Sequence, residues 1–132
     1  MNKLPTSIRK WGPATLMMLV IFIASSTPSK DMPGFGGWDT IVKKGGHMMG
    51  YALLAFAYAH GLGWNKKRWW LPWLLAVLYA ASDEFHQSFV PGRNATPVDV
   101  GIDSVGAGIG LLVGYTRMNL HRKGSHERSG TD

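Results

Sequence analysis

The segment SDEFHQSFVPGRNATPVDVGIDSVGAGIG, residues Ser82–Gly110, places four carboxylates between two apolar runs. The carboxylates are those of Asp83, Glu84, Asp99 and Asp103. An ionised carboxylate that faces hydrocarbon costs several kcal/mol unless it is paired or hydrated. The segment therefore predicts a fold in which neighbouring helices enclose these acids.

The composition of the chain suits one domain whose apolar residues are clustered. The 132 residues are 45% hydrophobic and 17% charged, with a formal net charge of +6 and no cysteine, which excludes disulfides and thiolate metal sites. A basic soluble protein of this size would suggest a nucleic-acid partner. Here the six tryptophans lie mostly beside apolar runs and the basic residues form short groups, which is typical of a membrane interface. We therefore expect membrane lipids, and not nucleic acid, as partners.

Four apolar segments stand out along the chain. They span Gly12–Ser26, Gly45–Gly63, Trp69–Phe85 and Val98–Tyr115. Each is near the lower limit of the roughly 17–25 residues that a spanning helix needs. Backbone groups in lipid must be satisfied within the segment, which favours helices. The pattern predicts an all-α membrane protein, a bundle of four short transmembrane helices.

The basic residues predict how this bundle is oriented. With the N-terminus in the cytoplasm, four basic residues fall outside: Lys30, Lys43, Lys44 and Arg93. The other ten fall inside: Lys3, Arg9, Lys10, Lys66, Lys67, Arg68, Arg117, Arg122, Lys123 and Arg128. Because cytoplasmic loops carry the excess of Lys and Arg, both termini are expected to be cytoplasmic.

The domain organisation follows from this orientation. We expect a basic cytoplasmic N-terminus at residues 1–11, a membrane domain at 12–117 and a polar cytoplasmic tail at 118–132. The tail lacks apolar periodicity and is expected to be disordered. An alternative treats the first apolar segment as a signal peptide ending at Ala24-Ser25-Ser26, which would leave three spans.

The last apolar segment carries a stripe of acids and glycines. Asp99, Asp103, Gly106, Gly110 and Gly114 follow spacings of one helical turn and so share one face. Glycines at such spacing let a neighbouring helix approach closely. The two aspartates should therefore point into the bundle. In the second segment, Gly46 and Gly50 have the same spacing and are expected to pack in the same way.

Candidate partners for these acids lie on two other predicted helices. His47 and Tyr51 are four residues apart and share a face, as do Asp83 and Gln87. Glu84 points roughly 100° away from Asp83, so the two acids should serve different purposes. His47 could pair with a carboxylate, bind a metal or move a proton.

The turn Pro91-Gly92-Arg93 brings one guanidinium to the acids. Arginine is suited to bidentate capture of a phosphate or carboxylate, and equally to a salt bridge that neutralises the cluster. A divalent cation held by Asp83, Asp99, Asp103 and His47 is a further alternative. So is a purely structural polar network.

Longer motifs carry a resemblance to a known family. They are Ser25-Ser26-Thr27-Pro28; Lys44-Gly45-Gly46-His47 followed by Tyr51; Asp83-Glu84-Phe85-His86-Gln87-Ser88-Phe89-Val90-Pro91-Gly92-Arg93; and Asp99, Asp103, Gly106, Gly108 and Gly110. On these motifs, residues 15–115 resemble the VanZ-like family of small bacterial membrane proteins. The resemblance implies a multi-pass protein of the bacterial cytoplasmic (inner) membrane. The family's name comes from a member tied to resistance to the glycopeptide teicoplanin. Relatives usually carry Asn where this chain has Asp103, which weakens a role carried over to that position.

Three functions compete on these residues. The first is a binding protein whose extracytoplasmic polar site, formed by His47, Tyr51, Arg93 and the acids, takes a lipid headgroup, a lipid-linked envelope precursor or a lipoglycopeptide. The second is an intramembrane enzyme acting on lipid-linked substrates, with Asp83 or Asp99 as base or metal ligand and His47 as acid. No obvious pair of nucleophile and base supports it. The third is a small proton- or ion-coupled transporter, which four short helices would form only as a homo-oligomer.

Overall fold

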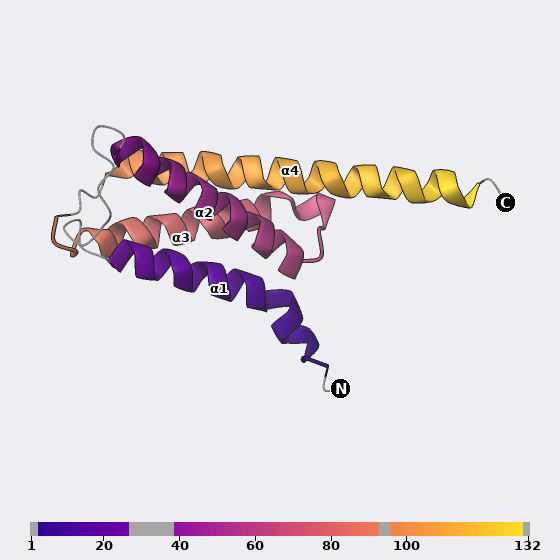
Figure 1. The fold of residues 1–132 in the computed structure, drawn as a ribbon, viewed down its shortest axis with the longest axis horizontal. Helices are drawn as coiled ribbons and strands as arrows, with labels where there is room; N and C mark the ends of the chain where they lie inside the picture. Colours follow the sequence, from indigo (N-terminus) through magenta and orange to yellow (C-terminus); the bar gives the residue numbers. More distant parts are fainter. Residues whose placement is uncertain (1–2, 27–38, 93–95, 131–132) are drawn as a thin grey trace.

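The computed structural model describes residues 3–26, 39–92 and 96–130, and within these ranges the chain forms helices and no strands. The α-helices are α1 (Thr6–Ser26), α2 (Asp39–Gly61), α3 (Trp70–Gln87) and α4 (Pro97–Ser129), with a 3-10 turn, η3 (Lys66–Arg68), before α3. The four helices lie over the four predicted apolar segments, so the predicted all-helical architecture is confirmed. Figure 1 shows them side by side, with α4 the longest.

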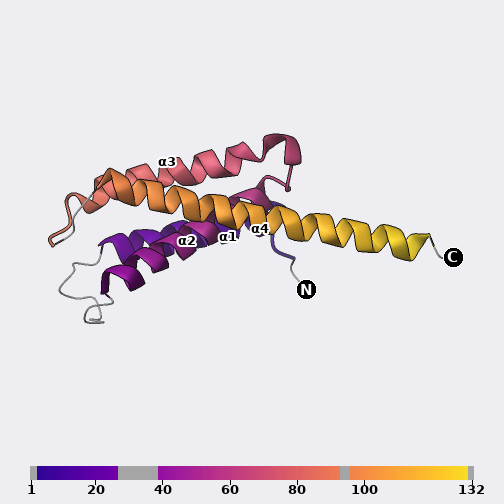
Figure 2. The same cartoon turned by 90° about the horizontal axis from the view of Figure 1, so that it is seen from above.

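Helix α4 differs from the prediction at its C-terminal end. It continues to Ser129, where residues 118–132 were expected to be a disordered tail. After Pro97 no proline interrupts its hydrogen bonds, and the polar residues of the tail include the good helix formers Lys and Arg. At about 1.5 Å per residue the 33-residue helix is about 50 Å long, and Figures 1 and 2 show it extending past the other helices.

The core of the bundle is rich in alanine. Helix α2 packs against α1, α3 and α4, most extensively against α4. Small side chains at the crossings let the helix axes approach, as is usual where helices associate in lipid. The buried apolar residues are Ala14, Ile21, Tyr51, Leu54, Ala55, Ala57, Tyr58, Ala59, Ala76, Ala80, Ala107 and Leu111.

Glycines of α4 make the closest approach to α2. A Cβ atom added at Gly106 would lie 2.5 Å from the carbonyl oxygen of Met48, and one at Gly110 would clash with the backbone of Ala52. A Cβ at Gly114 would lie 2.6 Å from the indole ring of Trp64. The predicted stripe on α4 thus faces α2.

The other predicted pair of glycines lies in a looser environment. A Cβ added at Gly50 would make ordinary contact with Ile21, 3.7 Å away, and one at Gly46 would meet nothing within 4 Å. Gly46 therefore does not mediate close packing here, in contrast to the expectation from its spacing. Gly46 instead lines an apolar groove that α2 forms with α1.

The outer surface of the bundle is strongly apolar. Large side chains such as Leu16, Leu19, Leu78, Ile109 and Leu112 are exposed. Of the helices in the described residues, α1 and α4 are long and apolar enough to cross a membrane, each with a mean hydropathy of 1.3. Only 11% and 28% of these two apolar stretches are buried in the bundle, whereas the core helix of a soluble protein would be mostly buried. The two helices point to a membrane protein.

The two ends of the bundle differ in chemistry. One end, hereafter the tryptophan end, carries Trp11, Trp64, Trp69 and Trp70 beside the basic turn η3. The other, hereafter the acid end, carries Asp83, Glu84, Asp99 and Asp103 at the end of α3 and the start of α4. Because α1 and α3 end where α2 and α4 begin, all four helices contribute to the acid end (Figure 1).

Candidate functional site

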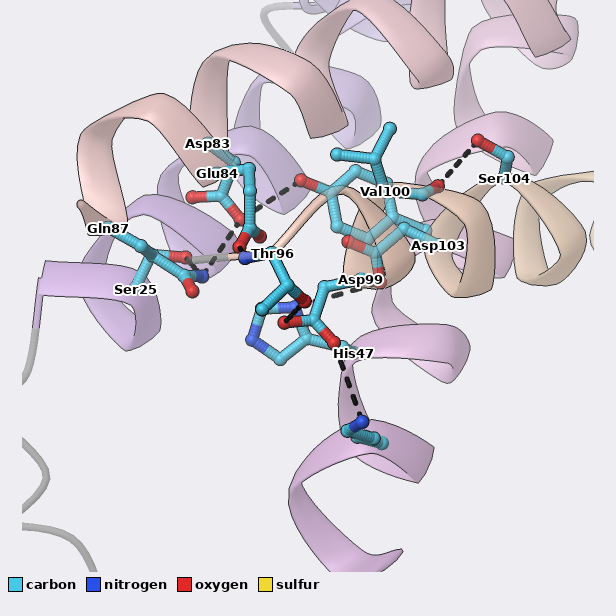
Figure 3. Close-up of polar contacts among 12 residues, drawn as sticks. Ser25, His47, Asp83, Glu84, Gln87, Thr96, Asp99, Val100, Asp103 and Ser104 are labelled. Carbon is cyan, nitrogen blue, oxygen red and sulfur yellow. Dashed lines mark hydrogen bonds and ion pairs between the residues drawn. The ribbon is translucent and has the colours of Figure 1, made fainter. Parts of the chain in front are cut away.

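A chain of buried hydrogen bonds joins three helices at the acid end (Figure 3). The hydroxyl of Tyr51 on α2 donates to Asp83 Oδ2 on α3 at 3.1 Å. The amide of Gln87 donates to the same oxygen at 3.4 Å and to Ser25 Oγ on α1 at 3.2 Å. All four side chains are buried, with at most 5% of any residue exposed. Asp83 is thus held by donors from its own helix and from α2.

A second contact joins α2 to α4. Nδ1 of His47 lies 3.8 Å from Oδ1 of Asp103, which is 2% exposed. The two rings of His47 and Tyr51 stack with centroids 6.4 Å apart, as their four-residue spacing on α2 allows. Asp103 is therefore enclosed beside the same face of α2 that carries Tyr51.

A third set of contacts ties the end of α3 to the start of α4. The backbone N–H of Thr96 donates to Glu84, and the hydroxyl of Thr96 donates to Asp99 Oδ2 at 3.1 Å. Lys44 Nζ lies 3.7 Å from the other oxygen of Asp99. Glu84 and Asp83 therefore have separate partners, in keeping with the angle between them on the helix.

These contacts pair the buried polar groups of the cluster. Among the described residues, every buried side-chain oxygen and nitrogen has a hydrogen-bond partner. Since a buried polar group without a partner costs about 1–3 kcal/mol, such complete pairing holds the acid end in one arrangement. The polar network is thus a structural element, whatever else the site does.

The divalent-cation alternative lacks a ligand set in the described part of the chain. No three His, Asp or Glu side chains there come together as metal ligands would. In the described structure, Asp83 faces Tyr51 and Gln87, Asp99 faces Lys44, and Asp103 faces His47. Arg93, which was predicted either to bind an anion or to neutralise the acids, lies outside the described residues.

The polar residues near the acid end that were missed as site candidates include Ser25, Ser26 and His86. Ser25 and Ser26 were noted as part of a motif and of the signal-peptide alternative, and His86 within a longer motif. The sequence did contain a signal for Ser25 and Ser26. Their hydroxyls lie at the end of an apolar segment, and buried hydroxyls need hydrogen-bond partners inside a bundle. Ser26 Oγ lies 2.9 Å from His86 Nε2, and the His86 ring stacks on Phe22 at 4.9 Å.

The contact between Ser26 and His86 resembles a pair of nucleophile and base only in its distance. Ser26 donates its hydroxyl proton to the carbonyl oxygen of Phe22 at 2.7 Å. The hydroxyl has one proton and two neighbouring acceptor atoms, so the direction of its contact with His86 depends on the tautomer of the imidazole. The contact links the ends of α1 and α3.

An apolar groove opens between α1 and α2 beside this network. It has a volume of about 210 Å³ and is hereafter the α1–α2 groove. Its apolar walls are formed by Met17, Val20, Ile21 and Ala24 of α1 and by Gly46 and Gly50 of α2. Lys43, His47 and Tyr51 also line it. An apolar groove whose lining residues include a lysine and a histidine can take the hydrocarbon part of an amphiphile, with its polar part near Lys43 and His47.

Comparison with known proteins identifies the family. Residues 10–118 match the family model described as VanZ/LLP1, which is most of the chain. The chain belongs to the VanZ/LLP1 family. No curated protein and no solved structure matches it. The resemblance inferred from the motifs is thereby confirmed.

Family membership agrees with the placement of the site. All the described residues of the acid end and of the α1–α2 groove fall within the matched range of the VanZ/LLP1 family, whereas the last residues of α4 lie beyond it. Together with the two apolar helices, membership points to a VanZ-like membrane protein.

Proposed function

We propose that this chain is a multi-pass protein of the bacterial cytoplasmic membrane that binds an amphiphile at its extracytoplasmic end. The amphiphile is a phospholipid or another envelope-associated molecule with an acyl chain and a polar head. In this proposal four helices cross the membrane, both termini are cytoplasmic, and the acid end faces outward. A role in glycopeptide resistance would then act through such an amphiphile.

The observation that carries the proposal is the position of the α1–α2 groove. Its apolar walls would take hydrocarbon, and His47 and Tyr51 lie where the groove meets the acid end. The Tyr51 hydroxyl donates to Asp83 and the His47 ring lies beside Asp103, so the polar network fixes the positions of these two rings at the groove. Lys43 on the same wall supplies a positive charge for an anionic headgroup.

The glycines of α2 allow a matched test of this binding. Gly46 lines the groove, and a Cβ at Gly46 or at its neighbour Gly45 would meet nothing within 4 Å. Gly46→Leu should therefore fill the groove while the helices stay packed. Gly45→Leu adds the same side chain to the same helix outside the groove.

The measurement is photo-crosslinking of the purified protein in vesicles containing a phosphatidylethanolamine with a photoreactive acyl chain. We expect wild type and Gly45→Leu to be labelled on peptides containing residues 17–24 or 43–51. Gly46→Leu should fall to the background level there. Equal labelling of Gly46→Leu and Gly45→Leu would reject the groove as the binding site.

A further inference from the structure

A second groove lies at the tryptophan end, on the other side of the bundle. It has a volume of about 380 Å³ and opens between α4 and the residues that begin η3 and α3. We call it the η3–α4 groove. Its lining includes Lys66, Trp69, Gly108, Leu112, Tyr115 and Asn119. None of these residues belongs to the acid end.

The floor of this groove follows one face of α4. Gly108, Leu112, Tyr115 and Asn119 are spaced by four, three and four residues, which places them in one row. From Gly108 to Asn119 the row is about 16 Å long at about 1.5 Å per residue. This is close to half of the roughly 30 Å hydrocarbon thickness of a bilayer. A single acyl chain of one leaflet has this reach.

Hydrogen bonds hold the groove at both ends. Near Gly108, the indole Nε1–H of Trp73 donates to the carbonyl oxygen of Ser104 at 3.0 Å, which joins α3 to α4. At the other end the hydroxyl of Tyr115 donates to the carbonyl oxygen of Asn65 at 3.3 Å. The side chain of Asn65 in turn accepts from the backbone N–H of Lys67 at 3.0 Å and caps η3.

The turn that carries η3 is also fixed by aromatic packing. Trp64 has a φ of 55°, which is uncommon for a residue with a side chain. Its ring packs edge-on against Tyr115 at 5.3 Å and against Phe56 at 4.7 Å. These contacts favour the turn and position the basic residues that follow it. The groove therefore exists before any ligand enters.

The η3–α4 groove is basic at the end formed by η3 and mostly apolar along α4. Lys66 begins a run of three basic residues, Lys66–Arg68, and Trp69 lies directly after it. An ammonium beside a tryptophan at a membrane interface is placed for a phosphate oxygen, and the apolar floor is placed for hydrocarbon. The charge complementarity selects an anionic headgroup.

We propose that the η3–α4 groove binds one anionic phospholipid of the leaflet at the tryptophan end. Lys66 binds the phosphate, and one acyl chain lies along the row of α4 that runs from Asn119 to Gly108. This inference uses the membrane placement proposed above but not the α1–α2 groove. The two sites lie at opposite ends of the bundle, so either can fail without the other.

The test uses lysines that are neighbours in sequence. Lys66 lines the groove and Lys67 does not, although both are exposed on η3. The full-length protein is extracted and analysed by native mass spectrometry with added phosphatidylglycerol or phosphatidylcholine. Wild type should retain phosphatidylglycerol in preference. Lys66→Gln should weaken that retention about fivefold, the effect of one lysine near an anionic surface, and Lys67→Gln by less than about twofold.

A second pair of variants tests the hydrocarbon part. A Cβ at Gly108 would come no closer than 3.8 Å to Trp73, so Gly108→Leu should project into the groove and reduce retention of phosphatidylglycerol. Gly101→Leu, at an exposed position of α4 with open space, should leave it unchanged. Equal effects of the two lysine variants, equal effects of the two glycine variants, or no headgroup preference in wild type would each overturn the proposal.

Discussion

At the residue scale, the acid end depends on Tyr51. The residue has no exposed surface. Of the two side chains that donate a hydrogen bond to Asp83 Oδ2, Tyr51 makes the shorter bond, at 3.1 Å compared with 3.4 Å for Gln87. Its ring lies 6.2 Å from that of Tyr79, whose own hydroxyl donates to the carbonyl oxygen of Met18 at 2.6 Å. Tyr51 therefore connects the buried acid of α3 to contacts with α1.

Tyr51→Phe should destabilise the protein by about 1–3 kcal/mol, because a buried acceptor loses its better donor. The matched control is Tyr58→Phe. Tyr58 is also buried on α2, but its hydroxyl takes no part in the hydrogen bonds described at the acid end. Its loss should change stability by less than about 0.5 kcal/mol. Thermal unfolding in detergent, followed by circular dichroism, compares the two; equal destabilisation would contradict the role given to Tyr51.

At the scale of the element, the glycine stripe of α4 sets how closely α2 can pack. The carbonyl oxygens of Met48 and Ala52 lie directly against Gly106 and Gly110, where any Cβ would be too close. The same approach brings Asp103, one turn earlier on α4, to His47. Helix packing and the polar contact thus depend on each other.

Gly110→Ala should push α4 away from α2 and cost about 1–3 kcal/mol, as overpacking of a close crossing does. Gly101→Ala is the control on the same helix. A Cβ there meets nothing within 4 Å, so the substitution should be neutral or stabilise the helix by up to about 1 kcal/mol. Unfolding in denaturant measures both, and a Gly110→Ala variant as stable as Gly101→Ala would show that the stripe does not limit packing.

At the scale of the whole molecule, the difference between the ends of the bundle predicts an orientation. Tryptophans and basic residues gather at one end and acids at the other, and each end is formed by parts of the chain far apart in sequence. Because basic residues favour the cytoplasmic side, the tryptophan end and the extension of α4 should face the cytoplasm. The acid end, with the α1–α2 groove, should face outward.

The absence of cysteine from the sequence makes this orientation directly measurable. Ser88 follows α3 at the acid end, and Ser125 lies on the extension of α4; both are exposed. In intact spheroplasts, a membrane-impermeant maleimide should label Ser88→Cys and leave Ser125→Cys unlabelled. Permeabilised cells, in which both should react, control for folding and access. Labelling of Ser125→Cys from outside would refute the predicted topology.

The sequence alone predicted the positions of the helices well. Apolar runs, separated by loops with glycine and proline, identify segments whose backbone must form local hydrogen bonds. It also predicted the face shared by Asp103, Gly106, Gly110 and Gly114, because helical spacing is a local property. It missed the extension of α4, since polar composition is a weak guide where no residue interrupts the helix.

The tertiary structure alone decided which partner each polar group takes. Gln87 contacts Ser25, and His86 contacts Ser26, although the partners are 62 and 60 residues apart in the sequence. No local sequence pattern predicts such pairs. The same holds for Gly46, whose spacing suggested packing but whose side of α2 faces a groove. Sequence determines which residues share a face of one helix. The rotation and crossing of the helices, set by the close approach of α2 to the glycines of α4, decide what that face meets.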